Sequence, residues 1–417
     1  MIWYVAIGLA VLLALSIPVG AALFLLGFGL DAFFAPLPLI RGLGQMVYSS
    51  SDSFLLIAIP LFVLLGEILV RAGIAERTYA TLDAWFSWLP GGLVHANIGT
   101  ATMFSATSGS SVATAATVAT VAMPQAKKQG YDQRLFAGAI AAGGALGILL
   151  PPSIVMVVYA STVDVSVGRM FLAGVIPGII AGGMLMVAIY AYARWKKLAR
   201  GQWAGWREIG RSGADAFWGL MLVVVVLGGI WGGVFTPTEA AAMAAVYAFV
   251  VANFIYRDMG PLKAPAAHGK PVMIKERAEE PQALAMSGGA VMLGRAGPGS
   301  SAAATSAHDP DRPIPLWRKP QALLTAWVHE DTQEVLYDAG KITITLMFII
   351  ANALILKHVL TEEQLPQQIT QAMLSWGLGP ITFLIVVNLI LLIGGQFMEP
   401  SGLIVIVAPL VFPIAME

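Results

Sequence analysis

Apolar residues recur along this chain in runs of about 20, the length at which an α-helix crosses a bilayer. Hydropathy predicts nine such segments, some of them longer. They lie at residues 3–30, 54–71, 90–124, 135–162, 169–193, 214–234, 238–256, 342–360 and 374–416. One water-soluble core would not need so many full-length apolar segments. The pattern therefore predicts an all-α polytopic membrane protein.

Two of these segments, 90–124 and 374–416, are about twice as long as one crossing needs. Each contains glycine, proline or serine near its middle. Such a segment can fold back as two helices that enter and leave the bilayer on the same side. We therefore expect two re-entrant helical hairpins.

Composition excludes several classes of function. The chain is 58% hydrophobic and 12% charged, about half the usual charged fraction, with a mean hydropathy of +0.77. Net charge is zero, so no basic face indicates nucleic acid. The absence of cysteine excludes thiolate metal sites, disulfides and cysteine nucleophiles. Met1–Tyr4 lack the basic residues of a signal peptide, so the first segment is interpreted as a retained helix.

Positive charges support the first hairpin. With both long segments as hairpins and a cytoplasmic N-terminus, 11 Lys and Arg residues fall in short cytoplasmic loops and 3 outside. The cytoplasmic ones are Arg71, Arg77, Lys127, Lys128, Arg134, Arg194, Lys196, Lys197, Arg200, Arg207 and Arg211, and the outer ones are Arg41, Arg169 and Lys357. Reading 90–124 as a plain crossing would place the Arg194–Arg211 run outside.

Residues 257–340 differ from the rest. Gly260–Pro315 is rich in Ala, Gly, Pro, Ser and charge, which predicts a partly disordered cytoplasmic insertion. Apolar residues at helical spacing follow at about 317–337, compatible with an amphipathic helix on the membrane surface or a solvated linker helix. The predicted domains are thus a first membrane region at 1–256, this insertion, and a second repeat at 341–417.

The two long segments share the pattern F-x-x-x-S-G-x-x-V, at Phe104–Val112 and Phe397–Val405. Their opposite predicted orientations are expected for an inverted-topology repeat, a common build of secondary transporters. After the first hairpin, Gly147-x-x-x-Pro151-Pro152-Ser153 should break a helix within the apolar segment. Carbonyls freed there could coordinate a cation, or neighbouring helices could satisfy an ordinary proline kink; the neighbouring polar hairpin favours a site.

Hydroxyl groups are dense from Ser105 to Ser111, which suits a hard cation, and amides at a half-helix N-terminus suit a carboxylate. Thr114 and Thr117 are explained by helix packing. Glu399, inside an apolar segment, is either a functional group or a hairpin tip wetted by a cavity. Glu239 is simpler: Thr236 or Thr238 caps a helix whose dipole the carboxylate faces.

Several chemistries lack their motifs. There is no Gly-x-x-x-x-Gly-Lys-Ser/Thr loop and no His-Glu-x-x-His. The five histidines are scattered without metal-ligand spacing, and His95 is expected to be packed rather than catalytic. No base is spaced to activate Ser108. The chain is not predicted to be an enzyme.

Four strings together resemble the large membrane subunit of TRAP transporters, the DctM family. They are Phe104–Pro124 (FSATSGSSVATAATVATVAMP), Gly143–Ala160 (GGALGILLPPSIVMVVYA), Gly232–Tyr247 (GGVFTPTEAAAMAAVY) and Gly394–Ile414 (GGQFMEPSGLIVIVAPLVFPI). The resemblance implies an inverted-repeat, elevator-type transporter in the bacterial inner (cytoplasmic) membrane. It implies sodium-coupled import of small organic acids such as C4-dicarboxylates or sialic acids, with sodium as coupling ion and no cofactor.

The resemblance also implies partners and sites. The partners are a small four-helix permease subunit and a periplasmic solute-binding protein. The first sodium site carries over to Ser105, Ser108, Gly147, Leu150 and Pro152, and the second lies partly near Gly394 or Gly395. Residues expected to meet substrate are Ser108, Gly109, Ser110, Ser111, Glu399 and Ser401.

Members of the family continue into a second helix with a Pro-Pro break, whereas this sequence ends at Glu417. We therefore expect a C-terminally truncated sequence with an incomplete second ion site. Two alternatives stay open. One is an elevator-type anion carrier that works without a binding protein. The other is a truncated membrane scaffold that does not transport.

Overall fold

The computed structural model describes residues 2–34, 44–45, 48, 52–198, 200, 203–263, 321–322, 325–364, 367–368, 371, 379–396 and 400–416. Over these residues the fold is helical and contains no strand beyond one isolated bridge. The main elements are α1 (Ile2–Ala14), α2 (Val19–Phe34), η2 (Phe54–Ile57), α4 (Ala58–Arg71), α5 (Ile74–Phe86), α6 (Gly92–Ser108), α7 (Ser111–Lys128), α8 (Gln133–Ala145), η3 (Leu146–Ile148), α9 (Ile154–Val163), α10 (Val167–Trp195), α11 (Trp206–Trp231), α12 (Pro237–Val250), η4 (Val251–Ile255), α14 (Glu330–Glu362), α16 (Pro380–Gly394) and α17 (Pro400–Met416).

Five helical stretches of the described chain are long and apolar enough to cross a membrane. They are Phe54–Arg71, Val167–Trp195, Trp206–Trp231, Pro237–Leu262 and Glu330–Glu362. Each coincides with a segment expected from hydropathy. The predicted cap before α12 is also present, because Thr236 and Glu239 form a reciprocal capping box.

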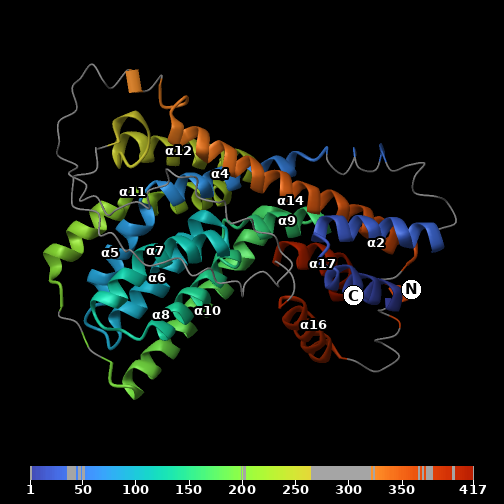
Figure 1. Cartoon of the computed structure of the whole chain (residues 1–417), viewed down its shortest axis with the longest axis horizontal. Coiled ribbons are helices and arrows are strands. Elements are labelled where there is room, and N and C mark those ends of the chain that lie inside the picture. The colour runs from blue at the N-terminus through green and yellow to red at the C-terminus, as the bar shows by residue number, and fades with distance from the viewer. Residues whose placement is uncertain are drawn as a thin grey trace.

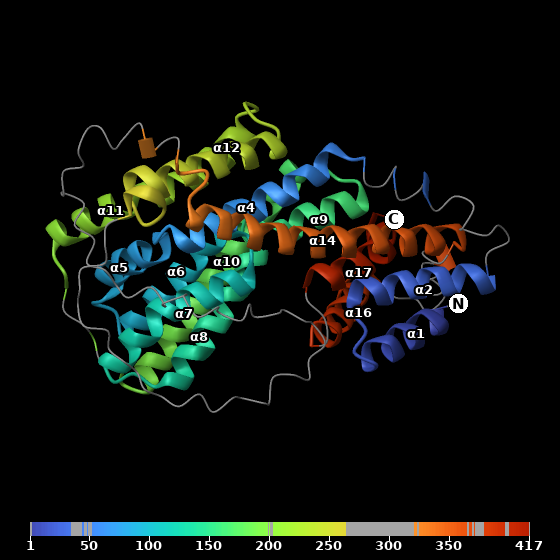
Figure 2. The same ribbon diagram turned by 45° about the horizontal axis from the view of Figure 1, so that its top comes forward.

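The molecule is elongated, and α14 runs along most of its length (Figures 1 and 2). Helices α5 to α8 gather at one end, while α1, α2, α16 and α17 gather at the other. The larger hydrophobic core joins α2, α4, α9, α12 and α14. A smaller core joins α6, α7 and α8 through residues such as Ile98, Val118 and Phe136. The segment 90–124 contributes Phe104 to the larger core and most of its other buried apolar residues to the smaller one.

The first apolar segment departs from its prediction. Residues 3–30 form two short helices, α1 and α2, and not one crossing. Ser16 has a φ of 58°, and Pro18 offers no amide hydrogen to continue the helix. Placing the N-terminus in the cytoplasm depends on counting residues 3–30 as a single crossing. With two helices there, that placement does not follow from the structure.

The helix expected at about 317–337 is also different. Residues 326–329 form a turn, and α14 begins at Glu330, with the His329 ring accepting a hydrogen bond from the Asp331 amide. The Thr332 hydroxyl donates to the Ala326 carbonyl across that turn, at 2.7 Å. Helix α14 itself begins at Glu330, and the domain boundary at 341 stays a prediction. The disorder predicted for the insertion concerns mostly residues outside the described ranges.

Both long segments contain an interruption, but in different registers of the shared motif. In the first, α6 ends with Ser108, and α7 starts at Ser111, after the motif glycine Gly109. In the second, α17 starts at Pro400, so the motif glycine Gly402 lies inside the helix. Proline suits the first turn of a helix because its missing amide hydrogen has no partner there. The common four-position pattern therefore does not give a common local structure.

Candidate functional site

The first interruption lies between α6 and α7. Gly109 ends α6 with a φ of 64°, a left-handed conformation that costs any residue with a Cβ about 1–2 kcal/mol. Ser110 then caps α7, because its hydroxyl accepts a hydrogen bond from the Ala113 amide at 3.3 Å. The sequence Ser-Gly-Ser thus stops one helix and starts the next within two residues.

The second interruption lies between α8 and α9. A single 3-10 turn, Leu146–Ile148, follows α8, and residues 149–153 are not helical. The Pro151–Pro152 peptide is cis. The Ser153 side chain is buried, and its hydroxyl donates to the Ile148 carbonyl at 3.0 Å. This hydrogen bond joins the two sides of the break, so the Pro-Pro sequence has a defined position.

The two interruptions are in direct contact. A Cβ placed on Gly109 would lie 3.0 Å from the Pro152 carbonyl oxygen and 3.2 Å from the Ile154 amide nitrogen. A Cβ placed on Gly147 would lie 3.1 Å from the Ser110 carbonyl oxygen and 3.2 Å from the Ser105 hydroxyl oxygen. Only glycine permits both approaches without displacing the neighbouring chain. Oxygen atoms of Ser105 and Ser110 consequently converge on Gly147.

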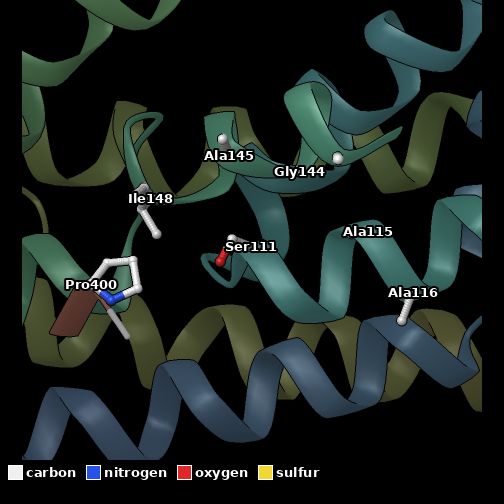
Figure 3. Close-up of a pocket in the computed structure, with 8 residues that line it drawn as sticks. Ser111, Ala115, Ala116, Gly144, Ala145, Ile148 and Pro400 are labelled. Atoms are coloured by element: carbon white, nitrogen blue, oxygen red, sulfur yellow. The ribbon is translucent and has the colours of Figure 1, made fainter. Parts of the chain in front are cut away.

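A pocket of about 480 Å³ lies beside this contact (Figure 3). It is lined by Ser111, Ala115, Ala116, Ala141, Gly144, Ala145, Ile148 and Pro400. Ser111, Ile148 and Pro400 lie together at one end of the pocket. Since Pro400 opens α17, the second long segment contributes to the same pocket as the first.

The residues that line the pocket are uncharged, and two of them open helices. Ser111 is the first residue of α7, and Pro400 is the first residue of α17. Helix N-termini carry partial positive charge and unpaired amide groups, so an anion is stabilised where two of them meet. Within the described residues there is no cluster of His, Cys, Asp or Glu suited to a metal. A cation at the breaks would therefore be held by hydroxyl and carbonyl oxygens.

The structure brings together part of the expected site. Ser105, Gly109, Ser110, Gly147 and Pro152 meet at the two breaks, and Ser111 lines the pocket. The Leu150 side chain is buried against α10, where a Cβ on Gly178 would approach it to 2.5 Å. Ser108 is the last residue of α6, although its side chain lies outside the described residues.

The second half of the expected site is placed differently. A Cβ on Gly394 would meet the Leu403 side chain of α17, and one on Gly395 would meet the Leu391 carbonyl of its own helix. These neighbours do not belong to the first break. Ser401 lies in the first turn of α17 but its side chain is outside the described part, and Glu399 lies wholly outside it.

Sequence reasoning missed two polar side chains at the breaks. Thr114, assigned to packing, is fully buried, with its hydroxyl 3.5 Å from that of Ser105. In the sequence Ser153 is only the residue after Pro-Pro, yet its hydroxyl bridges the break. No sequence spacing predicts the Ser105–Thr114 approach, because it depends on how α7 folds back on α6. His95, expected to be packed, is buried, with Nδ1 3.1 Å from the Gly91 carbonyl oxygen.

A helical membrane protein in which two interrupted helices meet beside a pocket has the features of the secondary transporter class. The profile of the family "Tripartite ATP-independent periplasmic transporter, DctM component" matches residues 6–292 and 322–417. The chain therefore belongs to the DctM family and is a TRAP transporter large permease, a membrane transport protein and not an enzyme.

Individual relatives agree with this assignment. The chain is 48% identical to the C4-dicarboxylate TRAP transporter large permease protein DctM of Vibrio cholerae serotype O1, over 97% of this chain and 77% of that protein. It is 40% identical to the protein of the same name from Pseudomonas aeruginosa, over 91% and 73%. Identity is 29% to the isethionate TRAP transporter permease protein DctMQ of Oleidesulfovibrio alaskensis, over 98% and 54%.

Proposed function

We propose that this chain is the large transmembrane subunit of a tripartite, sodium-coupled secondary transporter that imports a small organic acid. The observation that carries the proposal is the contact between the Gly109–Ser110 break and the Gly147–Ser153 break. A continuous helix satisfies its own backbone groups, whereas a break leaves them available to a ligand. Two breaks in contact offer such groups from both sides of one small volume.

The sodium part of the proposal rests on the oxygen atoms at Gly147. The Ser105 hydroxyl and the Ser110 carbonyl converge there, and Ser105 is fully buried. Oxygen ligands without a full negative charge suit a hard monovalent cation in an apolar setting. We assign a sodium ion to Ser105, Ser108, Gly147, Leu150 and Pro152, with the last three contributing backbone groups. A second ion near Gly394 or Gly395 is a separate proposal.

The organic-acid part rests on the pocket. Its position at the N-termini of α7 and α17 favours a carboxylate. Two of the relatives are named for C4-dicarboxylates, and we propose the same substrate class for this chain. Ser108, Gly109, Ser110, Ser111, Glu399 and Ser401 are the proposed contacts. Pro400 places the second segment at the pocket, so movement of that segment would change access to the substrate.

The remaining elements of the proposal concern the assembly. We propose a small permease subunit and a periplasmic binding protein as partners, an elevator motion of both re-entrant hairpins, and location in the inner membrane. One relative bears the combined name DctMQ, which supports a second permease component. A carrier of the same architecture without a binding protein is the alternative, and a scaffold that does not transport is a further one.

Uptake by proteoliposomes tests the proposal. The chain is reconstituted with its small subunit and binding protein, and labelled succinate uptake is measured with an inward sodium gradient. We expect uptake to need both the gradient and the binding protein. Equal uptake in a potassium gradient would refute sodium coupling. Uptake without the binding protein would favour the alternative carrier, and no uptake with all three components would favour the scaffold.

A pair of variants tests the ion site. Ser105→Ala combined with Ser108→Ala removes two proposed hydroxyl ligands, so the sodium concentration for half-maximal uptake should rise about tenfold or more. Thr120→Ala is the matched control, since this hydroxyl on α7 is exposed and bonds only the Thr117 carbonyl. An unchanged sodium dependence in the double variant would remove both serines from the site.

A further inference from the structure

The connection between α10 and α11 joins two helices that can each cross a membrane. Both helices are long and apolar enough to span, and only residues 196–205 separate them. A connection that short must stay close to the membrane–water interface. Its side chains are therefore in reach of lipid headgroups on that face, whichever side of the membrane it is.

Tryptophans gather at this connection. Trp195 and Trp206 are 76% and 80% exposed. The Trp203 ring contacts both Trp206 and Trp88 edge to face, with centroid distances of 5.5 and 6.4 Å. Indole rings prefer the depth of the headgroups, where their apolar body and their N–H group are both accommodated. The rings therefore indicate a surface immersed at headgroup level.

The same connection is strongly basic. From Arg194 to Arg211 the sequence contains six basic residues and one acidic residue, Glu208. All six basic side chains are exposed, and the Lys196 ammonium lies 5.1 Å from the Trp195 ring centroid. In the described structure none of the six forms a salt bridge with a carboxylate of this chain. Their charge is thus available to an external anion.

The connection is fixed to the start of the first interrupted segment. Arg200 forms an isolated antiparallel bridge with Pro90, just before α6. A Cβ on Gly91 would lie 3.1 Å from the Ala193 side chain near the end of α10. On the other side, the Trp85 indole nitrogen donates to the Ile209 carbonyl of α11 at 3.4 Å. A ligand held here would therefore also hold the turn that leads into α6.

We propose that an exposed patch on this connection binds the headgroup of an anionic phospholipid. This indole–basic patch consists of Trp195, Lys196, Lys197, Trp203, Trp206 and Arg207. The exposed charges supply affinity for the phosphate, and the indoles place that charge at the depth of the headgroups. A free phosphate ion would use the charges but gain nothing from the indoles. The binding is independent of sodium coupling and of the transported solute, and it stabilises the α5–α6 turn.

Lipid titration of the purified full chain tests this site. Phosphatidylglycerol is added to protein in phosphatidylcholine nanodiscs, and we measure retained lipid by native mass spectrometry and the thermal midpoint Tm. Substitution of Lys196→Gln, Lys197→Gln and Arg207→Gln together should weaken phosphatidylglycerol retention about tenfold or more, since each surface charge contributes measurably. The matched control substitutes Lys127→Gln, Lys128→Gln and Arg134→Gln, which are also exposed but lie at the end of α7 and the start of α8.

Four outcomes decide the proposal. Loss of retention in the first variant alone supports it, and equal loss in both variants overturns it, because charge alone then explains binding. Equal stabilisation by inorganic phosphate also overturns it. If the triple Gln variant does not fold, two other variants replace it. A variant that keeps the charges, with Lys196→Arg, Lys197→Arg and Arg207→Lys, should retain binding. A variant with Trp203→Leu and Trp206→Leu should weaken binding, and full retention in it contradicts the site.

Discussion

The two long segments with a common serine–glycine motif lie in very different surroundings. In the first, Phe104 is 1% exposed, Ser105 is fully buried, and Gly109 touches the Pro-Pro break. In the second, α16 exposes most of its apolar side chains, with Leu392 at 65%. Among the described elements of this segment, α17 packs against α9 and α14, and α16 packs against α17. A shared motif therefore gives neither a shared fold position nor a shared local structure.

This difference separates two sources of helix interruption. In the first segment the interruption is held by tertiary contacts. Gly109 faces backbone atoms of the Pro-Pro break, and Gly147 of that break faces the Ser110 backbone. In the second, α17 begins at Pro400, a residue type that suits the first turn of a helix. We expect the first segment to be sensitive to substitution and the second to be tolerant. The predictions below test that contrast.

The largest effect is expected from removing a core ring. Phe104→Ala should lower the free energy of unfolding by about 3–5 kcal/mol, because a nearly inaccessible aromatic side chain leaves a cavity. Leu392→Ala in α16 should change it by less than about 0.5 kcal/mol. Tm in detergent measures both. Similar losses would show that α16 is buried in the folded protein, which contradicts the contrast.

The motif glycines give the next largest effect. Gly109→Ala should cost about 2–4 kcal/mol, since it combines a left-handed φ with a contact of 3.0 Å to the Pro152 oxygen. Gly402→Ala lies within α17, where no left-handed conformation is needed, and should stay within about 1 kcal/mol. Denaturant titration compares the two. An equal loss at Gly402 would mean that the two glycines have equivalent roles, and a larger one would reverse the contrast.

A smaller effect is expected from polar side chains. Ser105→Ala should cost about 1 kcal/mol, because the buried Thr114 hydroxyl loses a neighbour at 3.5 Å. Asn388→Leu on α16 removes only a bond to the Leu384 carbonyl of its own helix, so its effect should be close to zero. Both are measured as shifts in Tm. An unaltered Tm for Ser105→Ala would show that this hydroxyl has no structural role.

The smallest effect is a pH dependence at Asp83 on α5, the helix that precedes the first long segment. Burial raises the pKa of the Asp83 carboxyl, on α5 outside the spanning helices. The folded protein then retains a proton that the unfolded chain releases, so stability falls as pH rises through the ordinary carboxyl range up to the raised pKa. Asp83→Asn removes this dependence. Its Tm minus that of the wild type should therefore increase from acid to neutral pH, and a constant difference would contradict burial as the cause.

Parts of the site could be predicted from the sequence because they depend on local chemistry. Pro151–Pro152 interrupts any helix by removing backbone donors, and Ser-Gly-Ser both stops and caps one. The Thr236–Glu239 capping box is equally local. The role of Thr114 could not be predicted, because the distance from its hydroxyl to that of Ser105 depends on the path of the chain between them.

By itself the sequence determined the helical membrane class, the family and the break of a helix at Pro151–Pro152. Hydrophobic run length and the special backbone chemistry of glycine and proline are local properties of the chain. Both can therefore be recognised from the sequence alone. The tertiary structure alone decided that Gly109 meets the Pro-Pro break and that Pro400 joins Ser111 at one pocket. Those features depend on contacts between residues far apart in the chain, and no local pattern encodes which partners a helix will meet.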